Sequence, residues 1–463
     1  MARIVLSSLA CVLLAARGAL AGITVDIEDA DSIKAAAALV AEDLMSYYDG
    51  NESGNIPGIL PEASSEKGYY YWWTGGLLWG SLLDYRDRTG ETKYDGLISQ
   101  GLQWQVGSNA DYLPANFTAQ LGNDDQAIWA LSALDADELD FTAPPSDDPQ
   151  WLDLAVNVFG EQASDARRVD DGDCKGALRW MLFTFSDGYD YVSAGANIEF
   201  FNLAAQLAWV TNNETYSDAA SDTYDLLVDI GFVTDKFQVY DGAQVDDCSA
   251  INKIQYSYTA AMLLQGSAYM YNHTSGATEW KDRVDGLVDA VTDTFFPDGV
   301  AFEVACESNN KCNTDIFFYK GTLHRGLGST VQMAPYTADK ILPILKTSAK
   351  AAVAQCTGGD NGRLCGYHWN STKNDGTSGA GQQLSVLSAL ISILPQQAAA
   401  AATGGNSSSS GNGTSSTGGS ASQNTTSDSD TSSSDTPGSL GVKVGISFGA
   451  LMGALVLGGL FLA

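Results

Sequence analysis

Apolar residues recur along this chain at helical spacing. Leu287, Val288, Val291 and Phe295 lie three or four residues apart, which places them on one face of a helix. Leu226, Leu227 and Ile230 repeat the same spacing, in contrast to the alternation that is typical of strands. The pattern predicts an all-α protein.

An internal repeat of about sixty residues organises these helices. An aromatic residue follows an apolar helix end and a turn at Tyr94, Trp151, Tyr216, Trp280 and Tyr336, with spacings of 57, 65, 64 and 56 residues. A repeat of this length that contains two helical stretches is a helical hairpin. Residues 23–395 have room for six hairpins.

The two helices of each hairpin differ in polarity. We expect first helices near residues 30, 92, 150, 216, 279 and 337, with a charged face, and second helices near 70, 123, 197, 254, 314 and 379. The second helices, such as 200–210 and 258–269, are nearly apolar all round, as buried helices are. Six inner and six outer helices predict an (α/α)6 toroid. An open solenoid is the alternative, but polar capping repeats are missing from both ends of the array.

Both ends of the chain resemble targeting signals. Residues 1–21 combine Arg3, an apolar stretch and the small-x-small sequence Ala19-Leu20-Ala21, which predicts a signal peptide; a membrane anchor is the alternative. The globular domain would span 22–395, followed by a Ser/Thr/Gly-rich stalk (396–439) and an apolar tail (440–463). Stalk and tail predict a glycosylphosphatidylinositol (GPI) attachment signal, with attachment in 432–438. A membrane-spanning tail anchor is the alternative, because Lys443 lies at the edge of the apolar stretch.

Secretion makes the cysteines informative. Six remain after Cys11 is removed with the signal, an even number suited to disulfides in an oxidising compartment. Short loops favour Cys306 with Cys312 and Cys356 with Cys365, which leaves Cys174 with Cys248, although six cysteines allow 15 pairings. Eight Asn-x-Ser/Thr sequons agree with this route: Asn51, Asn116, Asn213, Asn272, Asn370, Asn406, Asn412 and Asn424.

Net charge narrows the class of ligand. The 463 residues include 56 Asp and Glu against 24 Lys and Arg, a net charge of −32, which disfavours binding of nucleic acid. The 10 Trp and 20 Tyr suit a neutral sugar, which offers C–H faces to aromatic rings and hydroxyls to carboxylates. The sequence lacks a Gly-x-Ser-x-Gly elbow, a phosphate loop and a zinc-type histidine cluster, so we expect no metal and no cofactor.

One acidic pair opens an inner helix. In Gly122-Asn123-Asp124-Asp125-Gln126 the two carboxylates precede an apolar run, at the end of the ring where a ligand would bind. They could lie about 5 Å apart, the separation that retaining glycosidases use, with one protonated and one ionised. Helix capping is the alternative, since Asp-Asp pairs also occur at 147, 170 and 246.

Aromatic and amide side chains near the pair are candidate sugar contacts. Trp72 and Trp73 belong to an aromatic run that begins another inner helix, where core packing is an equally good explanation. With Asn123 and Gln126 beside the acids and Tyr258 at a third inner helix, they form the expected substrate-binding set.

A series of motifs over about residues 25–395 resembles the fungal members of glycoside hydrolase family 76, the mannan endo-1,6-α-mannosidases, including the defective-in-cell-wall and defective-in-filamentous-growth proteins. The motifs are Gly-Asn-Asp-Asp-Gln at 122–126, Tyr-Tyr-Trp-Trp at 70–73, Pro-Gln-Trp-Leu at 149–152, Leu-Arg-Trp at 178–180, Phe-Phe-Asn-Leu-Ala at 200–204, Glu-Val-Ala-Cys-Glu at 303–307, Cys-Asn-Thr-Asp at 312–315 and Gly-Gln-Gln at 381–383.

The resemblance implies an (α/α)6 barrel that cleaves α-1,6-linked mannose with retention. Asp124 would be the nucleophile and Asp125 the general acid/base. The resemblance to the anchored fungal members implies cleavage of a GPI-anchor glycan and transfer of the glycoprotein to cell-wall glucan. It also implies that the protein acts at the cell surface and is attached to the membrane by its lipid anchor.

Two alternatives and two departures accompany this interpretation. The alternatives are a non-catalytic mannan-binding or structural wall glycoprotein and an (α/α)6 polysaccharide lyase. The family usually has Asn after Ser257-Tyr258, where this chain has Thr259, and Leu323-His324-Arg325 is unusual. We expect both departures to affect substrate subsites.

Overall fold

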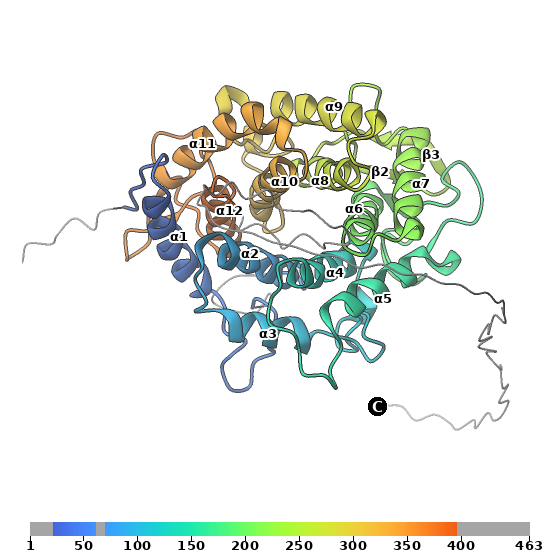
Figure 1. The fold of residues 1–463 in the computed structure, drawn as a ribbon, viewed down its shortest axis with the longest axis horizontal. Helices are drawn as coiled ribbons and strands as arrows, with labels where there is room; N and C mark the ends of the chain where they lie inside the picture. The colour runs from blue at the N-terminus through green and yellow to red at the C-terminus, as the bar shows by residue number, and fades with distance from the viewer. Residues whose placement is uncertain (1–21, 62–69, 396–463) are drawn as a thin grey trace, which may run out of the picture. The chain divides into compact units, whose positions relative to one another are not determined.

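Six inner helices form a closed ring in the computed structural model, which describes residues 22–61 and 70–395 (Figure 1). Each inner helix packs against the next along the chain, and the last packs against the first. The contact between last and first distinguishes a toroid from an open solenoid, so the predicted (α/α)6 architecture is confirmed. The inner helices are α2 (Trp73–Thr89), α4 (Asn123–Glu138), α6 (Ala194–Thr211), α8 (Ser257–His273), α10 (Tyr319–Met333) and α12 (Ala380–Ile391).

Six outer helices surround this ring and return the chain to the same end of it (Figure 1). In α9 the buried residues Trp280, Val284, Leu287 and Val291 form one stripe, whereas nearly every residue of α6 is buried. This difference between stripe and all-round burial is the one that the sequence predicted. The outer helices are α1 (Ala30–Met45), α3 (Asp95–Trp104), α5 (Trp151–Ala163), α7 (Glu214–Ile230), α9 (Thr278–Phe295) and α11 (Ala338–Ala354).

The twelve helices begin within five residues of the predicted positions; the largest difference is at α10, which begins at Tyr319. A 3₁₀ turn at Ile316–Phe318 precedes α10 and accounts for that difference. The other 3₁₀ turns are Thr118–Gln120, Asp165–Arg167, Pro297–Gly299, Glu307–Asn309 and Pro335–Thr337.

Short strands occur between the helices, which the helical periodicity did not predict. Strands β1 (Tyr191–Ser193), β2 (Gly242–Gln244) and β3 (Asp247–Asn252) form an antiparallel sheet in which Val192 pairs with Ala243. Strands β4 (Cys356–Gly358) and β5 (Leu364–Cys365) form a hairpin. Because β1 runs directly into α6, the sheet fixes the start of an inner helix.

Three disulfides join the pairs that short loops favoured: Cys174 with Cys248, Cys306 with Cys312, and Cys356 with Cys365. The Cys174–Cys248 bond ties the segment before α6 to strand β3, and the Cys356–Cys365 bond crosses the β4–β5 hairpin. Each bond therefore restrains an irregular segment between helices.

The end of the ring where the inner helices finish is filled by paired charges. Arg325 of α10 donates from Nε to Asp84 at 2.6 Å and from Nη2 to Asp135 at 3.0 Å. Tyr269 donates to Glu138 at 2.7 Å, and burial raises the pKa of Glu138 to about 8. These side chains line a cavity of about 20 Å³, room for about one water molecule. We call this the closed end.

In the part of the chain that the structure describes, no helix combines the length and apolar character needed to cross a membrane. The predicted signal peptide, stalk and attachment tail lie outside the described residues.

Candidate active site

The acidic pair lies at the other end of the ring, where α4 begins. Asp125 turns back and accepts a hydrogen bond from the backbone N–H of Gly122 at 2.7 Å, while Asp124 Oδ1 accepts one from the N–H of Asp125 at 2.9 Å. These are capping contacts, so the capping alternative describes part of what the residues do. Both side chains nonetheless remain partly exposed, so each can reach a ligand.

A loop from the next hairpin fixes the orientation of Asp124. The backbone N–H of Asn123 donates to Trp180 O at 2.8 Å, and the Trp180 indole Nε1 donates to Asp124 Oδ2, also at 2.8 Å. The approach is so close that a Cβ atom at Gly122 would lie 2.1 Å from Asp124 Oδ1. A glycine is therefore needed at this position for the observed carboxylate geometry.

The two carboxyl groups hold their protons unequally. Burial raises the pKa of Asp124 to about 6, opposed by hydrogen bonds from Asp125 N and Trp180 Nε1. Burial, and then the charge of Asp124, raise the pKa of Asp125 well above its usual value. Asp124 is therefore the more acidic of the two, and Asp125 holds its proton to higher pH, because two adjacent acids cannot ionise equally well.

Further acids and aromatic rings meet the pair from other inner helices. Asp315, just before α10, accepts a hydrogen bond from Trp73 Nε1 at 3.1 Å, and its charge raises the pKa of both aspartates of the pair. The rings of Tyr258 and Tyr319 lie 4.3 Å apart between centroids. The charge of Asp124 raises the pKa of both tyrosines, after the larger effect of burial.

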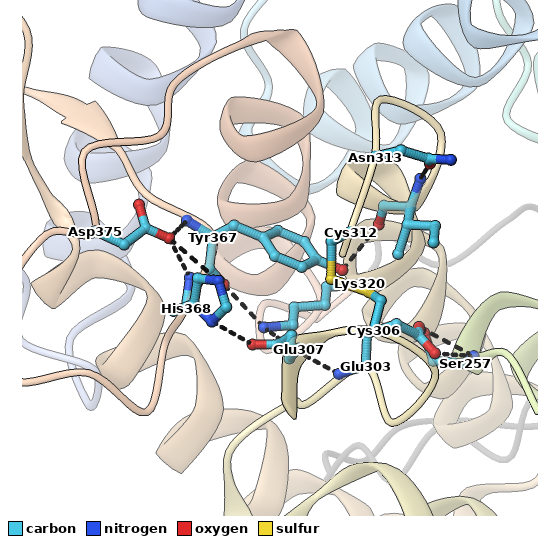
Figure 2. The surroundings of a disulfide bond; sticks show 11 residues. Ser257, Glu303, Cys306, Glu307, Cys312, Asn313, Lys320, Tyr367, His368 and Asp375 are labelled. Carbon is cyan, nitrogen blue, oxygen red and sulfur yellow. Dashed lines mark hydrogen bonds and ion pairs between the residues drawn. A yellow bond between two sulfur atoms is a disulfide. The ribbon is translucent and has the colours of Figure 1, made fainter. Parts of the chain in front are cut away.

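A buried network holds the segment that carries Asp315 (Figure 2). Lys320 pairs with Glu307 at 2.8 Å and donates to Tyr367 O at 2.9 Å, and the loop of Glu307 is closed by the Cys306–Cys312 disulfide. In the same loop, Glu303 accepts a hydrogen bond from the N–H of Ser257 at 3.2 Å and so caps α8. One network therefore positions the starts of both α8 and α10.

Three of the five predicted substrate-binding residues have packing roles in the structure. Trp72 is 7% exposed, its ring is stacked against Trp129 and Phe117, and its Nε1 donates to Gln105.

The other two of these residues are fully buried amides. Asn123 donates to Arg179 O and accepts from Arg167, whereas Gln126 donates to Asp111 O. Like Trp72, they pack and hydrogen-bond within the protein in this structure, and the sugar contact expected of all three stays a prediction. Trp73 and Tyr258 are partly exposed; Trp73 donates to Asp315, and the charge of Asp124 reaches Tyr258.

The unusual Leu323-His324-Arg325 segment lies away from the acidic pair, contrary to the subsite role expected for it. His324 is buried and its ring nitrogens contact Lys320 O at 2.7 Å and Ser348 Oγ at 3.0 Å. Arg325 belongs to the closed end. Helical spacing explains the difference. Residues one to two turns into α10 lie below the end of the ring that holds the acidic pair, which we call the mouth.

Sequence reasoning missed four side chains at the site: Glu199, Trp180, Asp315 and Tyr319. A signal existed for Glu199, because it is the only ionisable residue in the apolar helix α6. Trp180 and Asp315 belong to irregular segments, whose position no periodicity predicts. Among the described residues, no group of three or more His, Cys, Asp or Glu side chains is arranged to hold a metal ion.

Two partly exposed aspartates of unequal acidity, with aromatic rings nearby, provide the two carboxyl groups that retaining glycoside hydrolysis requires. The comparison with protein families agrees with this class. The model of glycosyl hydrolase family 76 matches residues 32–405, and the chain belongs to that family. It is therefore a glycoside hydrolase.

Curated relatives cover most of the chain. A putative mannan endo-1,6-alpha-mannosidase of Schizosaccharomyces pombe is 41% identical over 372 residues, which are 80% of this chain and 82% of the relative. The mannan endo-1,6-alpha-mannosidase DCW1 of Saccharomyces cerevisiae is 38% identical over 374 residues, 80% of this chain and 81% of the relative.

Solved structures share the fold. The crystal structure of Dfg5 from Chaetomium thermophilum in complex with glucosamine is 46% identical, with a TM-score of 0.77, and the match covers 80% of this chain and 92% of that one. An alpha-1,6-mannanase from Salegentibacter, bound to alpha-1,6-mannotriose as an inactive variant, has a TM-score of 0.62 at 17% identity, over 78% of this chain and 99% of that one.

Proposed function

We propose that this protein is a retaining endo-acting α-1,6-mannosidase or transglycosidase of the fungal cell surface, with α-1,6-linked mannan or a GPI-anchor glycan as donor. The observation that carries the proposal is the unequal pair: Asp125 keeps a proton while Asp124, bonded to Trp180 Nε1, is the more acidic group. The names of the fungal relatives support the linkage and the sugar.

The reaction proceeds in two steps. Asp124 attacks the anomeric carbon while the bond to the leaving oxygen breaks, and Asp125 donates its proton to that oxygen. The product of this step is a mannosyl ester of Asp124. Asp125, now ionised, removes a proton from an incoming hydroxyl, which attacks the anomeric carbon and releases Asp124. Water as acceptor gives hydrolysis, and a cell-wall glucan hydroxyl gives transfer.

Asparagine substitution tests the assignment. Asp124→Asn keeps the shape of the side chain but removes the nucleophile, so we expect cleavage of α-1,6-mannooligosaccharides to fall by about 10⁴-fold or more. The control is Asp147→Asn/Asp148→Asn, another adjacent acidic pair, which is exposed before the outer helix α5. Equal, measurable cleavage by the Asp124→Asn variant and the wild type would show that Asp124 is not the nucleophile. Cleavage by neither protein would show a non-catalytic mannan-binding or structural protein.

Product analysis separates the chemical outcomes. Proton NMR of the first product should show the α-anomer, because retention requires two inversions. Mass spectrometry with a mannoside donor and a β-glucan oligosaccharide acceptor distinguishes transfer, which links the two, from hydrolysis, which frees reducing mannose. Unsaturated sugar ends would instead indicate a lyase.

The cell-surface part of the proposal is supported by the patterns at the two ends of the chain and by three disulfides, which are typical of secreted proteins. Phosphatidylinositol-specific phospholipase C should release the full-length protein from membranes. A protein that stays in the membrane fraction after this treatment would instead have a spanning tail.

A further inference from the structure

Glu199 is a buried acid without an obvious structural role. It is 2% exposed and is the only ionisable residue of α6. Its Oε2 atom has no hydrogen-bond partner among the described residues. An unsatisfied buried carboxyl oxygen costs free energy, so its retention calls for an explanation from function.

Its surroundings place this carboxyl group at the acidic pair. Gly195 lies one helical turn earlier on the same face of α6, and a Cβ atom there would lie 2.6 Å from the hydroxyl oxygen of Tyr258. The hydroxyl of Tyr258 therefore lies against α6 next to Glu199. From α4, the charges of both Asp124 and Asp125 reach Glu199.

These neighbours favour the neutral form of Glu199. Burial first, and then Asp124 and Asp125, raise the pKa of Glu199 well above its usual value. The groups that face it are acids from α4 and the phenol of Tyr258 from α8, and none of the described groups that shift its pKa is a cation. A neutral carboxylic acid can both donate and accept a hydrogen bond.

The polar residues deeper in the ring do not use it. Asn202 donates to Gln265 at 3.1 Å, and Gln206 donates to Asn202 at 3.2 Å, so the chain of amides beyond Glu199 is formed without this carboxyl group. The Oε2 atom of Glu199 is therefore available to hydrogen-bond a ligand bound at the mouth of the ring.

We propose that the carboxyl group of Glu199 contacts the sugar bound against Asp124 and Asp125, and that it selects for a hydroxyl group on that sugar. The inference rests on the proposed function and adds a specificity-determining residue to it. A site built to hydrogen-bond a hydroxyl group rejects the analogue that lacks it, because the buried polar group is then left unpaired.

The test compares Glu199→Leu, Glu199→Gln and the wild type on α-1,6-linked mannotriosides that each lack one hydroxyl group. Glu199→Leu should lower kcat/KM on the complete donor by about 10- to 100-fold, the usual effect of losing one buried hydrogen bond to substrate. On one deoxy donor, the wild type and Glu199→Leu should become equal. Glu199→Gln, which still donates, should recover part of the loss.

Controls separate contact from folding. Gln206→Leu changes a buried polar residue two turns further along the same helix and should affect all donors alike. Melting temperatures report any loss of stability. A drop by Glu199→Leu of the same size on every donor, or no drop at all, would overturn the inference.

Binding distinguishes this outcome from failure of the proposed function. If the wild type cleaves no mannoside, the proposed activity is wrong, and calorimetry with α-1,6-mannotriose still decides the role of Glu199. We then expect Glu199→Leu to weaken binding by about tenfold relative to wild type. Equal affinities, or binding by neither protein, would overturn the inference.

Discussion

The two ends of the inner ring contain the same kinds of residue in different surroundings. At the closed end, Asp84 and Asp135 both receive hydrogen bonds from Arg325. At the mouth, the charges that reach Asp124 and Asp125 are negative, and hydrogen bonds from Trp180 and the backbone of α4 oppose them only in part.

This difference shows what a cation changes for a buried acid. Arg325 opposes the effect of burial on Asp135, although the pKa of that acid is still raised to about 7, and its hydrogen bonds give Asp84 and Asp135 a structural role. None of the described groups that shift the pKa of Asp124 or Asp125 is a cation, so these facing acids divide protons unequally and become available for proton transfer. Asp124 and Asp135 belong to the same helix, about 16 Å apart along its axis at 1.5 Å per residue. Variants at one end should therefore leave the other largely intact.

Removing Arg325 from the closed end should have the largest effect on stability. Arg325→Met leaves Asp84 and Asp135 without their partner, so we expect the free energy of unfolding to fall by about 3 to 5 kcal/mol. Denaturant unfolding measures this change. Activity per folded molecule should stay within about threefold of the wild type, since the chemistry lies at the other end.

Two further variants check that the loss of stability comes from buried acids left without a cation. Lys346→Met breaks an exposed ion pair with Glu28 and should cost less than about 1 kcal/mol. Asp84→Asn/Asp135→Asn/Arg325→Met removes all three charges and should recover part of the lost stability. Loss of activity in folded Arg325→Met would show that the two ends are coupled.

A methyl group at the mouth should damage catalysis without comparable loss of stability. Gly122→Ala places a Cβ atom 2.1 Å from Asp124 Oδ1, so the carboxylate must move. Displacement of a reacting group by about 1 Å can cost about 10²-fold in rate, which steady-state kinetics would detect. The backbone at residue 122 is extended and accepts alanine, so the effect comes from the displaced carboxylate.

The matched control is Gly160→Ala in α5, where an added Cβ atom has no neighbour within 4 Å among the described residues. It should leave the rate unchanged and stabilise the helix by about 0.5 to 1 kcal/mol. Full activity of Gly122→Ala would mean that the orientation of Asp124 tolerates more change than the geometry indicates.

The buried acids should also make stability depend on pH, by a smaller amount. Burial raises the pKa of Asp124 and Asp315 to about 6, that of Glu303 and Asp135 to about 7 and that of Glu138 to about 8. Between about pH 4 and pH 8 the folded protein therefore holds protons that the unfolded chain has released, and its stability falls as pH rises. The melting temperature should be a few degrees higher at pH 5 than at pH 8.

The Asp124→Asn variant sharpens this prediction. It removes one titrating group, so the melting temperature of the variant should depend less on pH than that of the wild type. The active-site pair would not behave as described if the wild-type melting temperature rose from pH 5 to pH 8.

The ring could be predicted from sequence because its information is local and repeated. An apolar stripe on one face, as in α9, indicates an outer helix, and apolar residues on all sides, as in α6, indicate an inner helix. Disulfide pairing followed from loop length in the same way. The acidic pair was recognisable because it stands at a helix start, and its backbone contacts there are local as well.

The rest of the site depends on contacts between distant segments. Trp180 reaches Asp124 across 56 residues and Asp315 reaches Trp73 across 242, and no spacing in the sequence predicts either contact. Trp72 illustrates the same point, since a tryptophan beside a site can face the ligand or the core. Its ring stacks against Trp129 and Phe117, which belong to other elements, so the sequence alone left both explanations open.

The contact of α12 with α2 fixes the number of hairpins in this protein. An open tandem array can gain or lose a unit by duplication or deletion, because each unit needs only its neighbours. Removing one hairpin here would leave two inner helices facing a gap, so divergence in length must fall in the connecting segments. Those segments supply Trp180 and Asp315, so substrate preference can diverge while the scaffold keeps its size.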